Sequence, residues 1–116
     1  LVEGVGGWRC PIAPPIFMSA LPQLLALPVI LVVGMRLGCL NHACLTLEAM
    51  QADGVTCLGW ILNQVEADMP YYAENRASLL QLLNIPLLGE CLFAAPLQLT
   101  AIGAQLLTPH KDINQA

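Results

Sequence analysis

Blocks of apolar residues separated by polar turns predict that strands and helices alternate along this chain. The run from Pro28 to Gly34 is continuously apolar and rich in β-branched residues, which is typical of a strand buried on both faces of a sheet. From Leu40 to about Ala52 apolar residues recur at helical spacing, and Asp53-Gly54 is expected to end that helix. Cys57 to Leu62 is predicted to be a second buried strand.

The carboxyl-terminal part continues this alternation. A helix is predicted from Met69 to Leu83, with Ala73, Arg76, Leu79, Leu80 and Leu83 at helical spacing. A short strand around Pro86 to Leu88 follows. Leu97 to Leu107 is expected to form a last helix, closed by Thr108-Pro109, before a polar tail.

Glycines and prolines punctuate the amino-terminal part. Leu1-Val2-Glu3 is predicted to be the end of a strand that runs into a glycine loop at Gly4 to Gly7. Arg9 to Pro15 is expected to be a loop, and Ser19 is expected to cap a short helix through about Ala26. Strands that alternate with helices at this spacing indicate βαβ units, and therefore an α/β fold with a parallel sheet.

Composition narrows the class of protein. The 116 residues are 57% hydrophobic, enough for one small domain. Charged residues make up 10% and the net charge is -4, so no basic face is available for a nucleic acid. Five cysteines without a C-x-x-C pair favour reduced thiols and the cytosol. The uncharged run between Arg9 and Arg36 is interrupted by five prolines, so no membrane span is expected.

Five blocks of sequence, in order, carry a family resemblance. The central block, Leu37 to Ala43, reads LGCLNHA. Two blocks precede it, VEGVGGW in Leu1 to Trp8 and LPVILVVG in Leu27 to Gly34. Two follow it, GWILN ending at Asn63 and PLLGE ending at Glu90. Together they cover about three quarters of the chain and keep their spacing. In these blocks the chain resembles the carboxyl-terminal half of dethiobiotin synthetase, and residues 1–116 are expected to be one portion of a single domain of that family.

The resemblance implies a partial P-loop NTPase-like parallel sheet with flanking helices, lacking the amino-terminal strands and the phosphate loop. It also implies a cytoplasmic homodimer that uses ATP and Mg²⁺ to close the ureido ring of dethiobiotin from 7,8-diaminononanoate and CO2. No G-x-x-x-x-G-K-[ST] motif occurs here, and Lys111 is the only lysine. We therefore assign no catalytic residue and expect the chain to be inactive alone; the alternative is a non-catalytic α/β remnant or a dimerisation module.

The nucleotide-binding residues implied by the resemblance lie in two places. The first group is Glu3, Gly4, Val5 and Gly6, in which Glu3 is also the expected Mg²⁺ ligand, because magnesium takes one or two carboxylates besides nucleotide phosphates. Asn63 and Gln64 form the second group, at the carboxyl end of a strand, where the Asn63 amide suits an adenine edge. Gln64 stands where the family usually has aspartate. An exposed Glu3 and a turn-forming Asn63 are the alternatives.

The substrate-binding residues implied by the resemblance are Gly38, Cys39, Leu40 and Asn41. Their loop meets a helix amino terminus, whose unpaired N–H groups and dipole favour an anion. In the family this loop comes from the second subunit and receives the substrate carboxylate. Asn41 is alternatively a helix cap, and His42 is expected to be a packing or interface residue. Arg36 replaces a family lysine, which keeps the charge and changes its hydrogen-bonding geometry.

Overall fold

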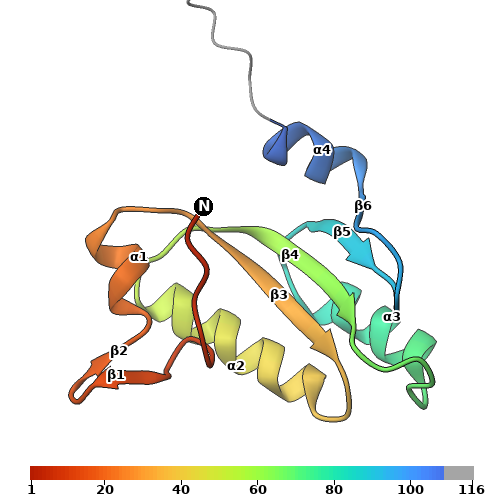
Figure 1. The fold of residues 1–116 in the computed structure, drawn as a ribbon, viewed down its shortest axis with the longest axis horizontal. Helices are drawn as coiled ribbons and strands as arrows, with labels where there is room; N and C mark the ends of the chain where they lie inside the picture. Colours follow the sequence, from red (N-terminus) through yellow and green to blue (C-terminus); the bar gives the residue numbers. More distant parts are fainter. Residues whose placement is uncertain (109–116) are drawn as a thin grey trace, which may run out of the picture.

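The centre of the molecule is a four-stranded sheet with the strand order β3-β4-β5-β6. It belongs to a computed structural model that describes residues 1–108. The strands are Val29–Met35, Cys57–Gln64, Leu87–Cys91 and Gln98–Leu99. β3, β4 and β5 run parallel, and the short β6 is antiparallel to β5 (Figure 1). The predicted α/β class with parallel strands flanked by helices is confirmed.

Two helices cover one face of this sheet. α2 (Cys39–Ala52) follows β3 and α3 (Tyr72–Leu82) follows β4, and both lie behind the strands in Figure 1. Their buried side chains form one apolar cluster with alternate residues of the strands. Its members include Leu31, Val33, Met35, Trp60 and Leu62 from the sheet, Ala43, Leu47, Met50 and Leu79 from the helices, and Leu83 directly after α3. This core fixes α2 against β3 and thereby positions the loop between them.

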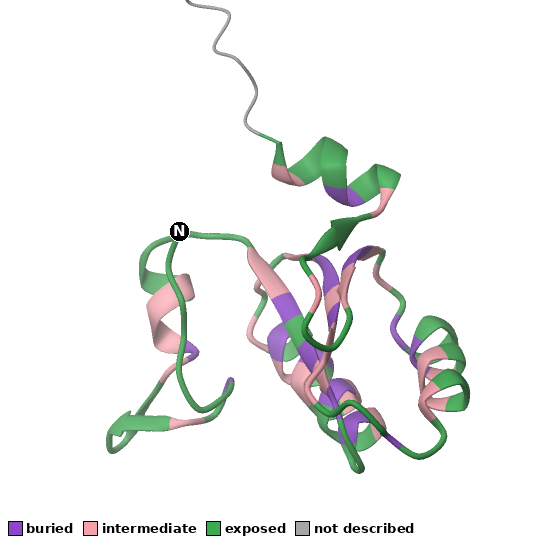
Figure 2. Ribbon diagram, turned by 45° about the vertical axis from the view of Figure 1, so that its right-hand side comes forward, coloured by how far each residue is buried: buried purple, intermediate pink, exposed green. Residues whose placement is uncertain are grey.

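The opposite face of the sheet is largely open, which corrects the prediction that the first strand is buried on both faces. Val32 points to this face and is 57% exposed, whereas its neighbours Leu31 and Val33 are buried. α2 and α3 cover only one face, and α4 (Ala101–Leu107) packs beside β5. β3 is also an edge strand within this part of the chain, because its partner on one side is β4 and the other side has none. Figure 2 shows the alternation of buried and exposed residues along β3.

The amino-terminal part differs from its prediction in two ways. Residues 1–3 form no strand; they are exposed and make no ladder with β3. The expected loop after Arg9 contains a small antiparallel hairpin of β1 (Pro11–Ala13) and β2 (Ile16–Phe17). α1 (Ala20–Leu24) follows as predicted, although the Ser19 side chain makes no capping bond to the helix. A strand at Leu1 needs a neighbour to pair with, and nothing described here provides one.

Several predicted boundaries shift for local reasons. β4 runs two residues further than predicted, and β5 extends to Cys91. α3 begins three residues late, because Tyr71 adopts a left-handed conformation with φ 57°. Its predicted face is partly wrong, since Ala73 and Leu80 are exposed and Tyr72 turns inward. α4 begins at Ala101 after β6, and the predicted helix end at Pro109 and the lysine Lys111 lie outside the described residues.

Two further features concern the class of protein. No helix in residues 1–108 is long and apolar enough to cross a membrane. All five cysteines are free thiols, and Cys39 is buried at the start of α2.

Candidate functional site

A cavity of about 520 Å³ lies where the glycine loop of the amino-terminal arm meets the end of β3 and the start of α2. Gly6 and Gly7 form one side, and Gly38 and Cys39 form the other. Arg36, His42 and Thr46 add polar side chains to the lining, and the remaining lining residues are Leu31, Val32, Val33, Gly34, Leu37 and Ala43. The structure therefore brings one predicted nucleotide-binding residue, Gly6, together with two predicted substrate-binding residues.

The glycine loop requires glycine at its tip. Gly6 and Gly7 have φ values of 75° and 101°, which lie in the left-handed region that side chains disfavour. A Cβ on Gly6 would lie 2.6 Å from Cys10 Sγ, so a larger residue also requires the Cys10 side chain to shift. The turn is closed by Cys10 N–H, which donates to the Gly7 carbonyl at 3.2 Å. The loop therefore exposes bare backbone to the cavity.

Tight contacts follow this loop in the sequence. Trp8 is buried in the core, and its indole Nε1 donates to Asp53 Oδ2 at 2.7 Å. Arg9 donates from both terminal nitrogens to the two Asp53 oxygens, at 2.6 and 2.9 Å. Hydrogen bonds from Arg9 and Trp8 lower the pKa of the Asp53 carboxyl, against a smaller opposing effect of burial. We call Trp8, Arg9 and Asp53 the Asp53 clamp.

The start of α2 offers free hydrogen-bond donors. Gly38 is its N-cap residue with φ 92°, and no side chain caps the helix. The N–H of Cys39 already donates to the Arg36 carbonyl at 3.0 Å. No acceptor within residues 1–108 is found for the N–H groups of Leu40 and Asn41. These two donors, rather than Cys39, are the ones open to an anion.

Arg36 supplies the positive charge of the cavity. Its guanidinium folds back over Gly34, where a Cβ would lie 3.1 Å from one terminal nitrogen. No carboxylate among the described residues pairs with it. A cation beside a helix amino terminus favours a bound carboxylate or phosphate. Sequence reasoning noted this arginine only as a departure from the family, although it is the cation of the site.

The structure decides the helix-cap alternative for Asn41, and it shows where His42 lies. Asn41 is not a helix cap, because Gly38 occupies that position. Asn41 is exposed, and its side chain has no partner within residues 1–108. His42 is exposed rather than packed in the core, and a Cβ on Gly7 would lie 4.0 Å from its Nε2. The His42 side chain, on the first turn of α2, therefore lies next to the glycine loop.

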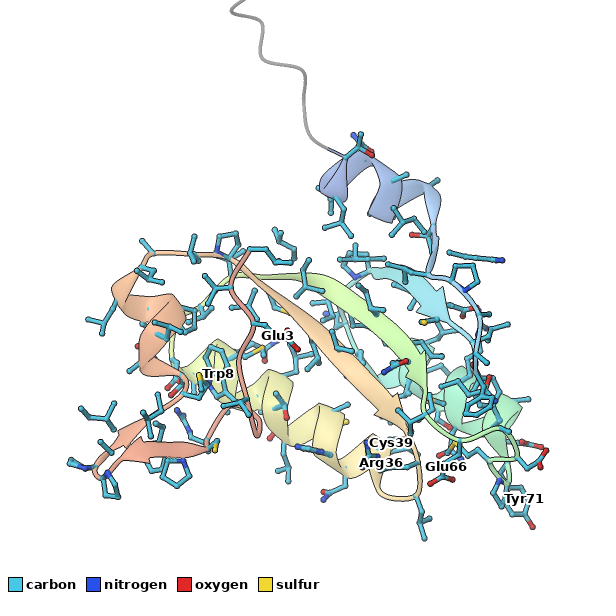
Figure 3. All side chains as sticks on the ribbon, viewed as in Figure 1. Glu3, Trp8, Arg36, Cys39, Glu66 and Tyr71 are labelled. Atoms are coloured by element: carbon cyan, nitrogen blue, oxygen red, sulfur yellow. The ribbon has the colours of Figure 1, made fainter. Side chains whose placement is uncertain are left out.

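The other predicted nucleotide residues do not line this cavity. Glu3, Gly4 and Val5 are exposed on the arm, and Figure 3 shows Glu3 beside β3, away from Arg36 and Cys39. No cluster of three or more metal-ligating side chains occurs in residues 1–108. Glu3 alone is one hard oxygen donor, which fits a magnesium ion held mainly by nucleotide phosphates and does not form a protein cage.

Asn63 and Gln64 end β4 at the carboxyl edge of the sheet, as predicted. Asn63 lies between Gly34 of β3 and Cys91 of β5, and its amide has no partner among the described residues. The Gln64 amide is engaged at both ends: its Oε1 accepts from Phe93 N–H at 3.2 Å, and its Nε2 donates to the Ala67 carbonyl at 3.4 Å. Asn63 is therefore free for a ligand, and Gln64 links two loops.

Comparisons with known proteins give the chain a context. Residues 1–97 match the family described as AAA domain. The chain is similar to three proteins named ATP-dependent dethiobiotin synthetase BioD. The protein from Cellvibrio japonicus is 51% identical to it over 97% of this chain, and the protein from Janthinobacterium sp. (strain Marseille) is 50% identical over 87%. The protein from Xylella fastidiosa (strain 9a5c) is 46% identical over 97% of this chain. The matched region is 47%, 43% and 50% of those proteins, so the chain spans about half their length. The resemblance drawn from the sequence blocks is confirmed.

Proposed function

Because the chain belongs to the AAA domain family, we propose that it forms the carboxyl-terminal, ligand-holding half of an ATP-dependent dethiobiotin synthetase. The reaction joins CO2 to 7,8-diaminononanoate and closes the ureido ring at the expense of ATP. The protein acts as a cytoplasmic homodimer. Support comes from relatives of that name at about half sequence identity over most of this chain.

The observation that carries this proposal is the cavity between the glycine loop and the start of α2. It combines bare glycine backbone with an unpaired arginine, and the free N–H groups of Leu40 and Asn41 lie next to its lining residue Cys39 at the start of α2. Such donors suit an anionic group. Its volume of about 520 Å³ is in the range of small-molecule sites. A diamine that ends in a carboxylate provides such a group.

We assign the substrate carboxylate to the loop Gly38 to Asn41, with the N–H groups of Leu40 and Asn41 as donors and Arg36 as the counter-charge. ATP is assigned to the backbone of Glu3 to Gly6 and to the Asn63 amide, with Gln64 holding the neighbouring loop. The carboxylate of Glu3 is the magnesium ligand. Magnesium neutralises phosphate charge when bound, and the role of this chain is to hold and orient both ligands.

Phosphoryl transfer is assigned to residues outside this chain. The sequence contains no phosphate-loop motif, and its single lysine, Lys111, lies beyond the described residues. Phosphate chemistry of this kind depends on positioning and on cations around the transferred group. In this proposal residues 1–116 hold the ligands, and the groups that carry out the transfer are not among them.

A second function is favoured by the open face of the sheet. An edge strand and an exposed Val32 are features of surfaces that associate with other chains. The chain would then be a non-catalytic remnant or dimerisation module. Two results together favour this function over the enzyme. The chain forms a stable dimer in size-exclusion chromatography, and it shows no ATP affinity even when it is fused to the part of a relative that it does not match.

The proposal is tested with a chimera. The part of the Cellvibrio japonicus relative that this chain does not match is fused to residues 1–116, and dethiobiotin formation from 7,8-diaminononanoate, bicarbonate and Mg-ATP is measured beside the intact relative. We expect product above background. Arg36→Gln should raise the diamine concentration needed for half-maximal rate about tenfold, whereas Glu48→Gln, at an exposed position of α2, should not. A folded chimera without product, beside an active relative, contradicts the proposal.

A further inference from the structure

Three segments that are distant in the sequence meet at the carboxylate of Asp53. Trp8 Nε1 and Arg9 donate three hydrogen bonds of 2.6–2.9 Å to its two oxygens. One Arg9 nitrogen also donates to Ser19 Oγ at 3.0 Å, and Ser19 is buried. The Asp53 clamp and Ser19 thus join the amino-terminal arm, the residue before α1 and the end of α2.

The position of Asp53 makes this arrangement specific. Asp53 is the C-cap residue of α2, where the free carbonyl groups carry partial negative charge and disfavour a carboxylate. A fork of two N–H groups from arginine and one indole N–H offset that unfavourable field. The carboxylate is therefore placed where it depends on Arg9 and Trp8 rather than on its own helix.

Backbone hydrogen bonds connect the clamp to the glycine loop. Ser19 N–H donates to the Trp8 carbonyl at 3.0 Å, and Met18 N–H donates to the Cys10 carbonyl at 2.8 Å. Cys10 N–H in turn donates to the Gly7 carbonyl at 3.2 Å. Gly7 thus directly precedes Trp8 of the clamp in the chain and is also hydrogen-bonded to Cys10.

Residues on the other side of the loop are held weakly. Residues 1–5 are exposed and make no ladder with the sheet, and a Cβ on Gly4 would touch only Met18. The clamp is therefore the strongest tie between this loop and the rest of the described chain. Figure 3 shows Trp8 at the base of the arm, against the carboxyl-terminal part of α2.

We propose that Arg9 and Asp53 are positioning residues that set where the glycine loop lies along α2, and so set the width of the ligand cavity. One wall of that cavity is Gly6 and Gly7; the other is the start of α2, next to His42. Asp53 lies eleven residues after His42, which is about 16 Å along a helix at about 1.5 Å per residue. Because Arg9 fastens the arm at the carboxyl-terminal end of α2, it fixes the distance between Gly6 and Gly7 and the amino-terminal end of that helix. The identity of the ligand in this inference rests on the proposed function. The positioning of the glycine loop by Arg9 and Asp53 does not depend on it.

The fastening is tested on the chain itself by NMR. Asp53→Asn removes the charge and Arg9→Lys keeps the charge but removes the two-pronged contact. We expect the backbone order parameters of Gly6 and Gly7 to fall from about 0.85 to below about 0.6 in Asp53→Asn, with a smaller fall in Arg9→Lys. Glu48→Gln removes a carboxylate from an exposed position of α2 and should leave the order parameters of Gly6 and Gly7 unchanged. The amide signals of β4 show that each variant is folded.

The decisive comparison uses the indole proton of Trp8, which reports whether its bond to Asp53 is broken. If that signal shifts in Asp53→Asn while Gly6 and Gly7 stay rigid, the clamp does not position the loop and the inference is wrong. The charge swap of Arg9→Asp with Asp53→Arg should recover part of the lost order, because the ion pair is restored in reverse. Failure to recover any order while the swapped variant is folded also counts against it.

A second measurement separates this inference from the proposed function. In the chimera, Asp53→Asn should raise the KM for Mg-ATP or diamine at least fivefold with a smaller change in kcat, because the ligand walls are displaced and the reacting groups are elsewhere. Unchanged KM values overturn the functional consequence of the clamp. A parent chimera that is inactive contradicts the proposed function instead, and the NMR comparison still decides whether the clamp holds the loop.

Discussion

The side-chain oxygen of Gln64 accepts a hydrogen bond from the backbone N–H of Phe93 at 3.2 Å, and this bond joins the end of β4 to the loop after β5. The two residues are 29 positions apart, and within residues 1–108 no other side-chain hydrogen bond joins these loops. The hydrogen bonding between the two loops beside Asn63 therefore depends on one amide group. Gln64 also donates to the Ala67 carbonyl, so the same group orders the turn that leads to α3.

Replacing Gln64 tests this link. Gln64→Ala should lower the free energy of unfolding by about 0.5–1.5 kcal/mol, the usual contribution of a hydrogen bond, with the low end expected because the site is exposed. Gln64→Glu keeps the acceptor for Phe93 and should lose less. Urea unfolding measures both, with Gln81→Ala at an exposed position of α3 as the control. A Gln64→Ala variant as stable as the control would show that the link is unimportant.

Gly103 of α4 packs against the backbone of β5. A Cβ there would lie 1.7 Å from the Leu88 carbonyl oxygen, which no side-chain movement relieves. Gly103→Ala should therefore destabilise α4, although alanine favours a helix by about 1 kcal/mol over glycine. We expect a net loss of about 1–2 kcal/mol from overpacking.

The neighbouring position supplies the control for Gly103. Ala104 is exposed, so Ala104→Gly should cost about 1 kcal/mol through helix propensity alone. The methyl group of alanine is thus expected to stabilise the chain at position 104 and to destabilise it at position 103. If Gly103→Ala is as stable as the parent chain in thermal unfolding, α4 does not dock on β5 as described.

The elements between β3 and β4 were predictable from the sequence because their signals are local. A continuous apolar run and a helical repeat bounded by Asp53-Gly54 fix β3 and α2 to within a residue or two. The exposure of one face was not predictable, because a continuous apolar run normally indicates a strand buried on both faces, and the run does not say which segments cover each face. Val32 shows this: its residue type suits a core, and only the absence of a covering helix in residues 1–108 leaves it exposed.

The candidate site was predictable only where a short motif carried it. Gly38 marks the start of α2 because its left-handed conformation favours glycine, and the motif around it is contiguous. The Asp53 clamp and the Gln64–Phe93 bond join residues that are 44–45 and 29 positions apart. No periodicity links such pairs, so they appear only once the chain is folded. The sequence predicts Asp53 as the end of a helix, but it does not predict that Asp53 accepts hydrogen bonds from Trp8 and Arg9.

The open face of the sheet predicts losses of stability of different size at two adjacent valines. Val32→Thr places a hydroxyl at a position that is 57% exposed and should change stability by less than about 0.5 kcal/mol. Val33→Thr places it at a position that is 5% exposed, where a hydroxyl without a partner costs about 1–3 kcal/mol. Urea unfolding of the two variants measures the difference. Equal losses would mean that both faces of β3 are covered in solution, for example by a second copy of the chain.

Tyr72 carries a buried hydroxyl with no hydrogen-bond partner in the described residues. Burial and the nearby Glu90 carboxylate raise its pKa, and Arg76 opposes them. Tyr72→Phe removes the unpaired group and keeps the ring, so we expect the chain to be unchanged or up to about 1 kcal/mol more stable. Tyr71→Phe, at a position that is 75% exposed, is the control. A clear loss of stability on removing the Tyr72 hydroxyl would show that a partner is present in solution.

The Asp53 clamp predicts a stability change at acidic pH. Hydrogen bonds from Arg9 and Trp8 lower the pKa of Asp53 in the folded chain, whereas an unfolded aspartate titrates near about 3.9. A group whose pKa is lower in the folded state contributes stability above its unfolded pKa, and this contribution is lost as the pH falls through the folded value. The difference in urea midpoint between the parent chain and Asp53→Asn should therefore be constant from pH 7 to about pH 5 and shrink below about pH 4.

Other carboxylates also titrate in that range, so the informative quantity is the difference between the two proteins rather than either curve. Arg9→Gln should remove most of the pH dependence of this difference, because the arginine is the first cause of the lowered pKa. Salt near 1 M should reduce the difference at pH 7, since the Arg9 side chain is 48% exposed and such pairs are screened. A midpoint difference that is the same at pH 7 and pH 3 would mean that the Asp53 carboxylate is not paired in solution, and that the arm is held by the Trp8 ring alone.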